Sequence, residues 1–326
     1  MATTTSPQTE LQRFADDVRK GLEAAPKTLS SKYFYDDEGS RIFQEIMKLP
    51  EYYLTRCERE IFQQQAADIY QAFKNENASF DLIELGPGDG SKTALLIDHF
   101  LKQSADFTYV PIDISAEALR ILSDNFQAKF PDLTIREKNG DYFRMLETLK
   151  EFPDERTKIV FFLGSNIGNF RQAESLVFFQ RLSAAMSKDD LLFIGVDLQK
   201  DPRVILPAYD DPSGVTSAFN LNLLKRMNRE LDADFAVENF MHYASYQPTD
   251  GAARSYLISR EKQTVRVGAL GQSFEFAQWE PIYMEISQKY TLEMLEKLAE
   301  KCGFRIVKNF FDQKNYYTNS LWKALR

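Results

Sequence analysis

The chain has 326 residues, of which 44% are hydrophobic and 27% are charged, and its formal net charge is −8. These values are ordinary for a globular protein of one large or two smaller domains, and an acidic chain without a basic stripe is a poor candidate for nucleic-acid binding. Two isolated cysteines, Cys57 and Cys302, predict neither a disulfide framework nor a metal site. Since no signal peptide or membrane-spanning run is visible, we expect a cytoplasmic enzyme.

The amino-terminal part of the chain predicts helices. Apolar residues have helical spacing from Leu11 to Leu22, and further helices are expected at about 39–48 and 56–72. Residues 80–86, FDLIELG, form a short apolar run that ends in a glycine, which predicts a buried strand and a sharp turn. We expect Ser91 to cap the helix that follows this turn.

Strands and helices then alternate as far as residue 198. A helix capped by Ser115 and a second helix that contains Leu176, Phe179, Leu182 and Met186 separate further expected strands, at 107–113, 133–141, 158–164 and 191–198. Strands separated by helices predict a parallel, doubly wound sheet with helices on both faces. The fold class is therefore expected to be α/β with a Rossmann-like core.

The pattern changes after Asp197 and returns at Thr291. Between them lie a loop, a helix at about 216–230 and several alternating stretches typical of strands; beyond them come a helix to Cys302 and strands at 304–311 and 319–325. We therefore expect two domains. The Rossmann-like, cofactor-binding one comprises 58–199 plus 290–326, and a smaller α+β, substrate-binding one comprises 1–57 plus 200–289.

The motif Glu84-x-Gly86-x-Gly88-x-Gly90, followed by Ser91-Lys92-Thr93, can be interpreted in three ways. A dinucleotide loop, G-x-G-x-x-G, needs its third glycine one residue later. A P-loop, G-x-x-x-x-G-K-[ST], needs a glycine where Ser91 stands, although Lys92-Thr93 fits and LLFIGVD resembles a Walker B strand. The third interpretation is an S-adenosylmethionine loop at the end of the first strand.

Two acidic residues at strand ends favour the third interpretation over ordinary turn glycines. Asp113 closes the second strand, where a carboxylate can accept the ribose hydroxyl protons, and Asp141 closes the third, where it can accept the adenine amino proton. A P-loop protein needs neither residue. We therefore predict an S-adenosylmethionine-dependent methyltransferase whose cofactor site comprises Glu84, Gly86, Gly88, Lys92, Asp113, Asp141 and Tyr142, with the head of Lys92 in solvent or paired to an acid.

Long, unusual blocks occur along the chain: KTLSSKYFYDDEGSRIFQEIMKLPEYYLTRCERE, ELGPGDGSKT, FLGSNIGNF, AYDDPSGVTSAFNLNLLKRMNREL and EPIYMEISQKY. Through them the chain resembles, over almost its full length, the histidine Nα-methyltransferases of ergothioneine biosynthesis. The resemblance implies a Rossmann-like cofactor domain and a second domain that closes over the amino acid. It also implies three successive methylations of the α-amino group of histidine, which give hercynine, the histidine betaine.

The resemblance also implies a role for particular residues. Asn169 matches the residue that holds the α-amino and carboxylate groups, and Tyr35 matches one near the amine; these two are the expected catalytic residues. The remaining substrate contacts would come from Tyr209 at the carboxylate, Phe43 and Tyr52 around the imidazole, and Glu285 and Ser287 hydrogen-bonded to the imidazole. Glu285 and Ser287 are two residues apart, so an extended segment would point both the same way.

One departure from the family pattern concerns specificity. Ser255 occupies a position where the family often has a methionine, and a smaller side chain would enlarge the pocket. Another aromatic amino acid, such as tryptophan or tyrosine, therefore stays an alternative substrate; a P-loop phosphotransferase and a non-catalytic binding protein are more distant ones. We expect a monomer that acts by positioning the amine, without a strong general base, and structural roles for His99 and His242.

Overall fold

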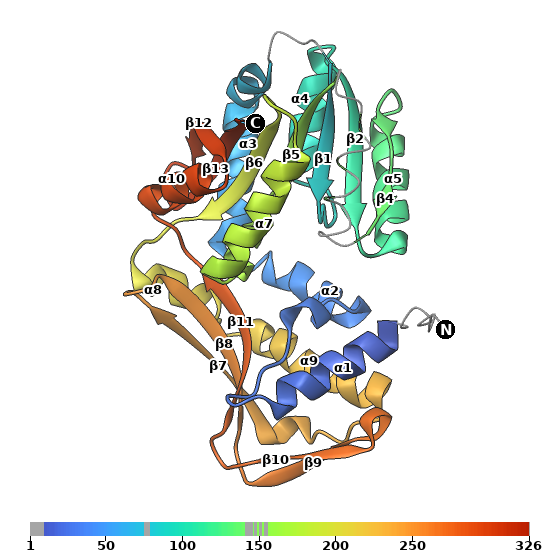
Figure 1. The fold of residues 1–326 in the computed structure, drawn as a ribbon, viewed down its shortest axis with the longest axis vertical. Helices are drawn as coiled ribbons and strands as arrows, with labels where there is room; N and C mark the ends of the chain where they lie inside the picture. Colours follow the sequence, from blue (N-terminus) through green and yellow to red (C-terminus); the bar gives the residue numbers. More distant parts are fainter. Residues whose placement is uncertain are drawn as a thin grey trace, which may run out of the picture. The chain divides into compact units, whose positions relative to one another are not determined.

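The computed structural model describes residues 10–74, 79–140, 146, 149, 152 and 156–325. The chain divides into two compact units, one formed by Met1–Tyr53 and Asp201–Ser287 and the other by Leu54–Lys200 and Gln288–Arg326. Figure 1 shows the elements of both units. The sequence placed the three boundaries after residues 57, 199 and 289, so they differ by a few residues from those observed.

The unit formed by 54–200 and 288–326 contains an eight-stranded sheet in the order β12-β13-β6-β5-β1-β2-β3, with β4 also paired to β2. The pairs within β6-β5-β1-β2 are parallel, as are those of β2 with β3 and β4. The strands are β1 (Ser79–Leu85), β2 (Asp106–Asp113), β3 (Thr134–Ile135), β4 (Lys138–Asn139), β5 (Thr157–Phe162), β6 (Leu191–Asp197), β12 (Phe304–Phe311) and β13 (Tyr317–Ala324).

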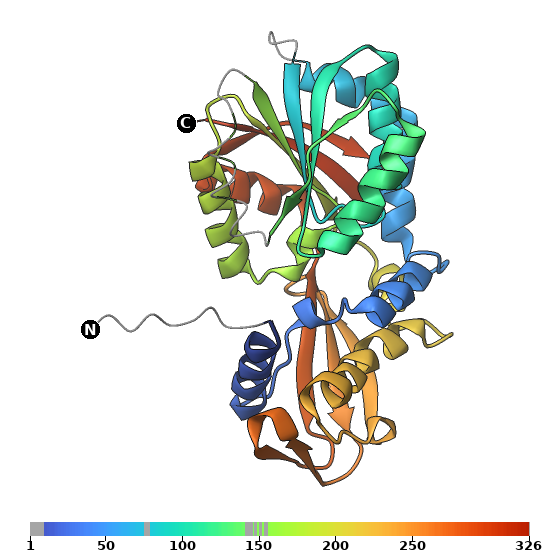
Figure 2. The ribbon, with the colours of Figure 1, turned by 90° about the vertical axis from the view of Figure 1, so that its right-hand side faces the viewer.

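Helices cover both faces of this sheet. Figure 2 shows α3, α4 and α5 along one face and α7 and α10 along the other. The strands of the sheet centre are apolar and buried on both sides, which is why β1, β5 and β6 read as continuous apolar runs. This is the Rossmann-like α/β core that the sequence predicts; its helices are α3 (Tyr53–Phe73), α4 (Thr93–Lys102), α5 (Ala116–Lys129), α7 (Gln172–Ala185), α10 (Leu292–Lys301) and the 3-10 turn η3 (Asn166–Asn169).

Two expectations about this sheet were wrong. The strand expected at 133–141 is two short strands, β3 and β4, at the edge beyond β2, where polar residues replace an apolar run. The sheet is also not wholly parallel, because β13 runs antiparallel to both β12 and β6. Only five residues separate β12 from β13, and a connection that short permits only an antiparallel pair.

The expected capping residue of α4 was also wrong. The helix begins at Thr93 with Lys92 as its N-cap residue, and no side chain caps it. The backbone N–H of Ser91 instead donates to Asp89 Oδ1 at 2.9 Å, so Ser91 belongs to the turn before the helix. Ser115 does cap α5 as predicted, accepting from the backbone N–H of Ala118 at 3.1 Å.

The other unit combines helices with a three-stranded sheet, β11-β8-β7, and a separate hairpin of β9 and β10. Figure 1 shows α1, α2 and α9 gathered on one side of the three-stranded sheet. No helix among the described residues is both long and apolar enough to cross a membrane. The elements are α1 (Glu10–Glu23), α2 (Asp37–Ile46), α8 (Pro202–Ile205), α9 (Val215–Leu231), β7 (Phe240–Gln247), β8 (Ala252–Ser259), β9 (Gln263–Val267), β10 (Gln272–Phe276), β11 (Pro281–Gln288) and the 3-10 turns η1 (Ser31–Tyr33), η4 (Leu206–Ala208), η5 (Val237–Asn239) and η6 (Gly268–Leu270).

Two glycines of the loop after β1 offer a test of how this loop packs against α5. Both have positive φ, 59° at Gly88 and 65° at Gly90, so alanine at either position strains the backbone by about 1–2 kcal/mol. A Cβ at Gly90 would also overlap Leu122 and come within 2.6 Å of the Phe126 ring, whereas nothing lies within 4 Å at Gly88. Gly90→Ala should therefore lower the free energy of unfolding by about 1–3 kcal/mol more than Gly88→Ala, measured by urea denaturation. Equal losses would contradict this account of Gly90.

Candidate functional site

The glycine loop follows β1 at the carboxyl edge of the sheet. Gly86 begins it with a φ of 63°, and its backbone N–H donates to the carbonyl of Ile112 at 2.8 Å. Gly88 is exposed and has open space where a side chain would be, so its backbone can be approached closely. Gly90 instead packs against α5. The surroundings of Gly88 thus leave room for a ligand, whereas those of Gly90 do not.

The strand register places the second predicted feature beside this loop. Leu85 pairs with Ile112, so Gly86 and Asp113 follow at neighbouring positions, and Asp113 pairs with Asn139 at the end of β4. Gly140, which comes next, donates its N–H to the carbonyl of Asp113 at 3.0 Å. Asp141 and Tyr142, the other predicted cofactor residues at this edge, lie outside the described residues.

Asp113 is a partly buried carboxylate that accepts from two backbone donors. Burial raises its pKa from the ordinary 3.8, while the backbone N–H groups of Ser115 and Ile114 act in the opposite direction. One of these bonds joins the Ser115 N–H to Asp113 Oδ1 at 2.9 Å. A carboxylate has about four acceptor positions, so these two donors leave acceptor capacity for the two hydroxyls of a ribose.

Both carboxylate oxygens of Glu84, in contrast, already accept hydrogen bonds from other side chains. Its two oxygens accept from the hydroxyls of Thr93 and Tyr109, each at 2.6 Å, and burial raises its pKa. These bonds tie β1 to β2 and to the start of α4, the elements that flank the glycine loop. The role of Glu84 in cofactor binding stays a prediction, and the hydrogen bonds support an indirect one.

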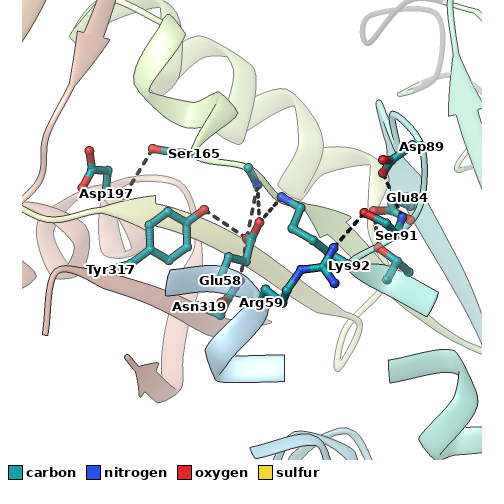
Figure 3. A network of polar contacts seen from close by, with 12 residues as sticks. Glu58, Arg59, Glu84, Asp89, Ser91, Lys92, Ser165, Asp197, Tyr317 and Asn319 are labelled. Carbon is teal, nitrogen blue, oxygen red and sulfur yellow. Dashed lines mark hydrogen bonds and ion pairs between the residues drawn. The ribbon is translucent and has the colours of Figure 1, made fainter. Parts of the chain in front are cut away.

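Lys92 forms an ion pair with Glu58, a residue that sequence analysis had overlooked (Figure 3). Glu58 lies on α3 and is completely buried. Besides Lys92, its carboxylate accepts from the backbone N–H of Gly164 at 3.1 Å, from the hydroxyl of Tyr317 at 3.0 Å and from the side-chain amide of Asn319 at 3.0 Å. The ammonium of Lys92 is therefore paired to an acid.

A sequence signal for Glu58 exists, but it lies on another strand. Gly195 stands in the middle of the apolar strand LLFIGVD, and a glycine inside a strand often marks a close approach of another group. A Cβ at Gly195 would overlap both Glu58 Oε1 and the hydroxyl of Tyr317. The glycine thus predicts that something lies against β6, but not which residue it is.

The turn that carries Asn169 follows β5. Gly164 and Ser165 have φ values of 71° and 61°, and the backbone N–H of Asp197 donates to Ser165 Oγ at 3.1 Å. The 3-10 turn η3 comes next and ends at Asn169, which is exposed. Since β1 and β5 are parallel neighbours, this turn begins at the same sheet edge as the glycine loop.

In the other unit, the structure brings three predicted aromatic residues together. The ring centroids of Tyr35 and Phe43 are 5.5 Å apart, and those of Phe43 and Tyr52 are 6.2 Å apart, both edge-to-face. Phe219 of α9 completes the group, at 5.5 Å from Tyr35 and 5.7 Å from Phe43. Phe219 is buried and supports the cluster from beneath, whereas Tyr35 is 43% exposed.

Of the polar residues predicted to bind the substrate in this unit, Tyr209 and Ser287 contact each other. The hydroxyls of Tyr209 and Ser287 are 2.8 Å apart and hydrogen-bonded. Glu285 lies two residues before Ser287 on β11, so the segment is extended as predicted. Ser287 is buried and Glu285 is half-buried. Hydroxyls that can each donate or accept, near a carboxylate, suit a ligand with both kinds of polar atom.

Ser255 and His242 lie on the two other strands of that sheet. Ser255 is buried on β8 two residues before Leu257, a core residue of this unit, whereas Glu285 directly follows the core residue Met284. Strand alternation therefore points Ser255 and Glu285 to opposite faces, which gives no support to the idea that Ser255 enlarges the pocket beside Glu285. Burial lowers the pKa of His242.

Comparison with known proteins assigns the chain to a family. The family model described as "Histidine-specific methyltransferase, SAM-dependent" matches residues 14–324. The histidine N-alpha-methyltransferase of Mycolicibacterium smegmatis is 39% identical over 89% of this chain and 88% of its own length. The protein of the same name from Mycobacterium tuberculosis is 35% identical over 94% of this chain and 93% of its own length.

A more distant relative has a different printed substrate. The 4-dimethylallyltryptophan N-methyltransferase of Claviceps fusiformis is 26% identical over 84% of this chain and 82% of its own length. The family match, which covers nearly all of the chain, and the two mycobacterial relatives agree with the cofactor interpretation of the glycine loop. The chain belongs to the S-adenosylmethionine-dependent, histidine-specific methyltransferase family.

Proposed function

We propose that this protein transfers methyl groups from S-adenosylmethionine to the α-amino group of L-histidine and forms hercynine. The observation that carries the proposal is the open backbone at Gly88, in the loop at the ligand-binding edge of the sheet. The first residue of that loop, Gly86, neighbours Asp113, a carboxylate with spare acceptor capacity. The choice of histidine is supported by the two relatives named histidine N-alpha-methyltransferase. It is also supported by the polar group of Tyr209, Ser287 and Glu285.

The chemistry requires positioning more than proton transfer. When bound, S-adenosylmethionine supplies a methyl group on a sulfonium, which makes the reaction an in-line displacement at carbon. The residues of this chain then have to hold the amine lone pair in line, and aligned reactants account for much of the rate in such reactions. Asn169 offers both a donor and an acceptor to the amino and carboxylate groups, and Tyr35 offers a hydroxyl to the amine. Water can take the amine proton.

Recognition of the side chain is assigned to Glu285 and Ser287, with Tyr209 at the carboxylate. An imidazole has two ring nitrogens, one a donor and one an acceptor in the neutral form, and a carboxylate with a hydroxyl can satisfy both. The bond between Tyr209 and Ser287 would open or be shared when a zwitterionic substrate enters. Since buried polar groups left unpaired are costly, apolar amino acids should be poor substrates.

The second candidate is N-methylation of another aromatic amino acid. It is favoured by the relative that is named for a tryptophan derivative. A P-loop phosphotransferase is disfavoured, because the ammonium of Lys92 is held by Glu58. That the protein is a cytoplasmic monomer without a nucleic-acid partner stays a prediction from its sequence.

Asp113→Ala tests the cofactor assignment. Loss of the acceptor for the ribose hydroxyls should weaken binding of S-adenosylmethionine and of its demethylated product by about 1–3 kcal/mol, measured by calorimetry. Asp106→Ala is the matched control, because Asp106 begins the same strand at the opposite sheet edge, and its affinity should equal that of the wild type. Unchanged affinity in Asp113→Ala would refute the ribose assignment.

Glu285→Ala tests the substrate assignment. If its carboxylate pairs with the imidazole, kcat/KM for histidine should fall, and the histidine-to-tryptophan ratio of kcat/KM should drop by about tenfold or more. The control is Glu275→Ala, which removes an exposed glutamate from β10 of the same unit and should leave the ratio unchanged. An unchanged ratio in Glu285→Ala would mean that Glu285 does not recognise the side chain, and the second candidate would then gain ground.

A further inference from the structure

Glu58 links elements that are far apart in the sequence. Its carboxylate receives a donor from the residue before α4, one from the turn after β5 and two from β13: Lys92, Gly164, Tyr317 and Asn319. A buried carboxylate is costly unless such donors surround it, and here an ammonium balances its charge. Figure 3 shows the side chains of Lys92, Tyr317 and Asn319 converging on Glu58.

The fold makes room for this carboxylate. Gly195 of β6 has a negative φ, which any residue tolerates, so its backbone does not require glycine. A side chain there would instead overlap Glu58 Oε1 and the Tyr317 hydroxyl. Glycine at this position therefore leaves the space that the Glu58 carboxylate fills, although a glycine inside a strand has no side chain to pack.

Two of the segments that Glu58 links, the glycine loop and the turn after β5, must lie at fixed positions relative to each other for the proposed reaction. Lys92 ends the glycine loop and precedes the first residue of α4. Gly164 begins the turn that leads to Asn169, and that turn is held on its other side by the bond from the Asp197 N–H to Ser165 Oγ. One carboxylate thus fixes both the end of the cofactor loop and the start of the segment expected to hold the amine.

We propose that Glu58 is a positioning residue for methyl transfer: it holds the glycine loop and the Gly164–Asn169 segment at a fixed separation, so that cofactor and amine are aligned. The inference rests on the proposed function for the role of Asn169, and on the family assignment for the cofactor. Misplacement of reacting groups by about 1 Å can cost on the order of a hundredfold in rate. A carboxylate that acts this way affects turnover beyond its effect on stability.

The experiment compares Glu58→Gln with a matched buried ion pair of the same unit. Lys158 and Asp190 are 3.3 Å apart with side chains 2% and 4% exposed, and they lie where β5 and β6 begin, at the opposite edge of the sheet. Asp190→Asn therefore removes a comparable charge without touching the ligand edge. For each variant, the measurements are the thermal unfolding temperature, the cofactor-binding stoichiometry, kcat and the KM for histidine.

Both variants should unfold at lower temperature and still bind about one cofactor per chain. We expect kcat per cofactor-binding site to fall by about tenfold to a hundredfold in Glu58→Gln, with the KM for histidine changed less than kcat, and to stay within about twofold in Asp190→Asn. Unchanged kcat in Glu58→Gln, or equal losses in both variants, would overturn the proposal. If Glu58→Gln does not fold, Tyr317→Phe removes one donor without removing a charge and should still lower kcat, by about threefold; no loss would count against the proposal.

A separate readout distinguishes this inference from the proposed function. If wild-type protein methylates no histidine, the substrate proposal fails, and Glu58 can still be tested through the cofactor. Its removal frees Lys92 beside the glycine loop, so Glu58→Gln should weaken binding of the demethylated cofactor by about tenfold, and Asp190→Asn should not. Equal affinities in the two variants would then refute the positioning role.

Discussion

The ligand-binding edge of the eight-stranded sheet depends on the ion pair and hydrogen bonds of one carboxylate, that of Glu58. It is completely buried, and its charge is tolerated because an ammonium, a backbone N–H, a hydroxyl and an amide surround it. Those four donors come from three segments, so the requirement to satisfy one charge also fixes the glycine loop, the turn after β5 and the start of β13. A buried charge with several partners thus specifies geometry as well as stability.

The order of the strands makes this arrangement possible. Parallel pairing of β1, β2 and β5 brings Gly86, Asp113 and Gly164 to one sheet edge. The antiparallel β13 then runs beside β6 and presents Tyr317 and Asn319 at that same edge, opposite Asp197 and Gly195. If β13 ran parallel to β6, it would begin at the opposite edge of the sheet, and its first residues would lie away from the ligand side. The sequence predicted a strand here but not its antiparallel direction, and that direction completes the surroundings of Glu58.

The fold class and most elements could be predicted from local patterns, since apolar runs, glycines and the Ser115 cap act over a few residues. The cofactor edge could be predicted in outline, because a strand end, a glycine loop and Asp113 follow each other in the chain. Glu58 could not, because its partners are up to 261 residues away and an acidic residue on a helix is ordinarily solvated. The hydrogen bond from Tyr109 on β2 to Glu84 on β1 could not be predicted either, because it joins residues on two different strands.

The central claim, methylation of the histidine α-amino group, is tested most directly by mass spectrometry of the purified protein with S-adenosylmethionine and each proteinogenic amino acid in turn. The account predicts that histidine is converted through its mono- and dimethylated forms to the trimethylated betaine, with one demethylated cofactor released for each methyl group, and that apolar amino acids stay unmodified. Methylation of a different amino acid with histidine untouched, or methylation on the imidazole instead of the α-amino group, would contradict it.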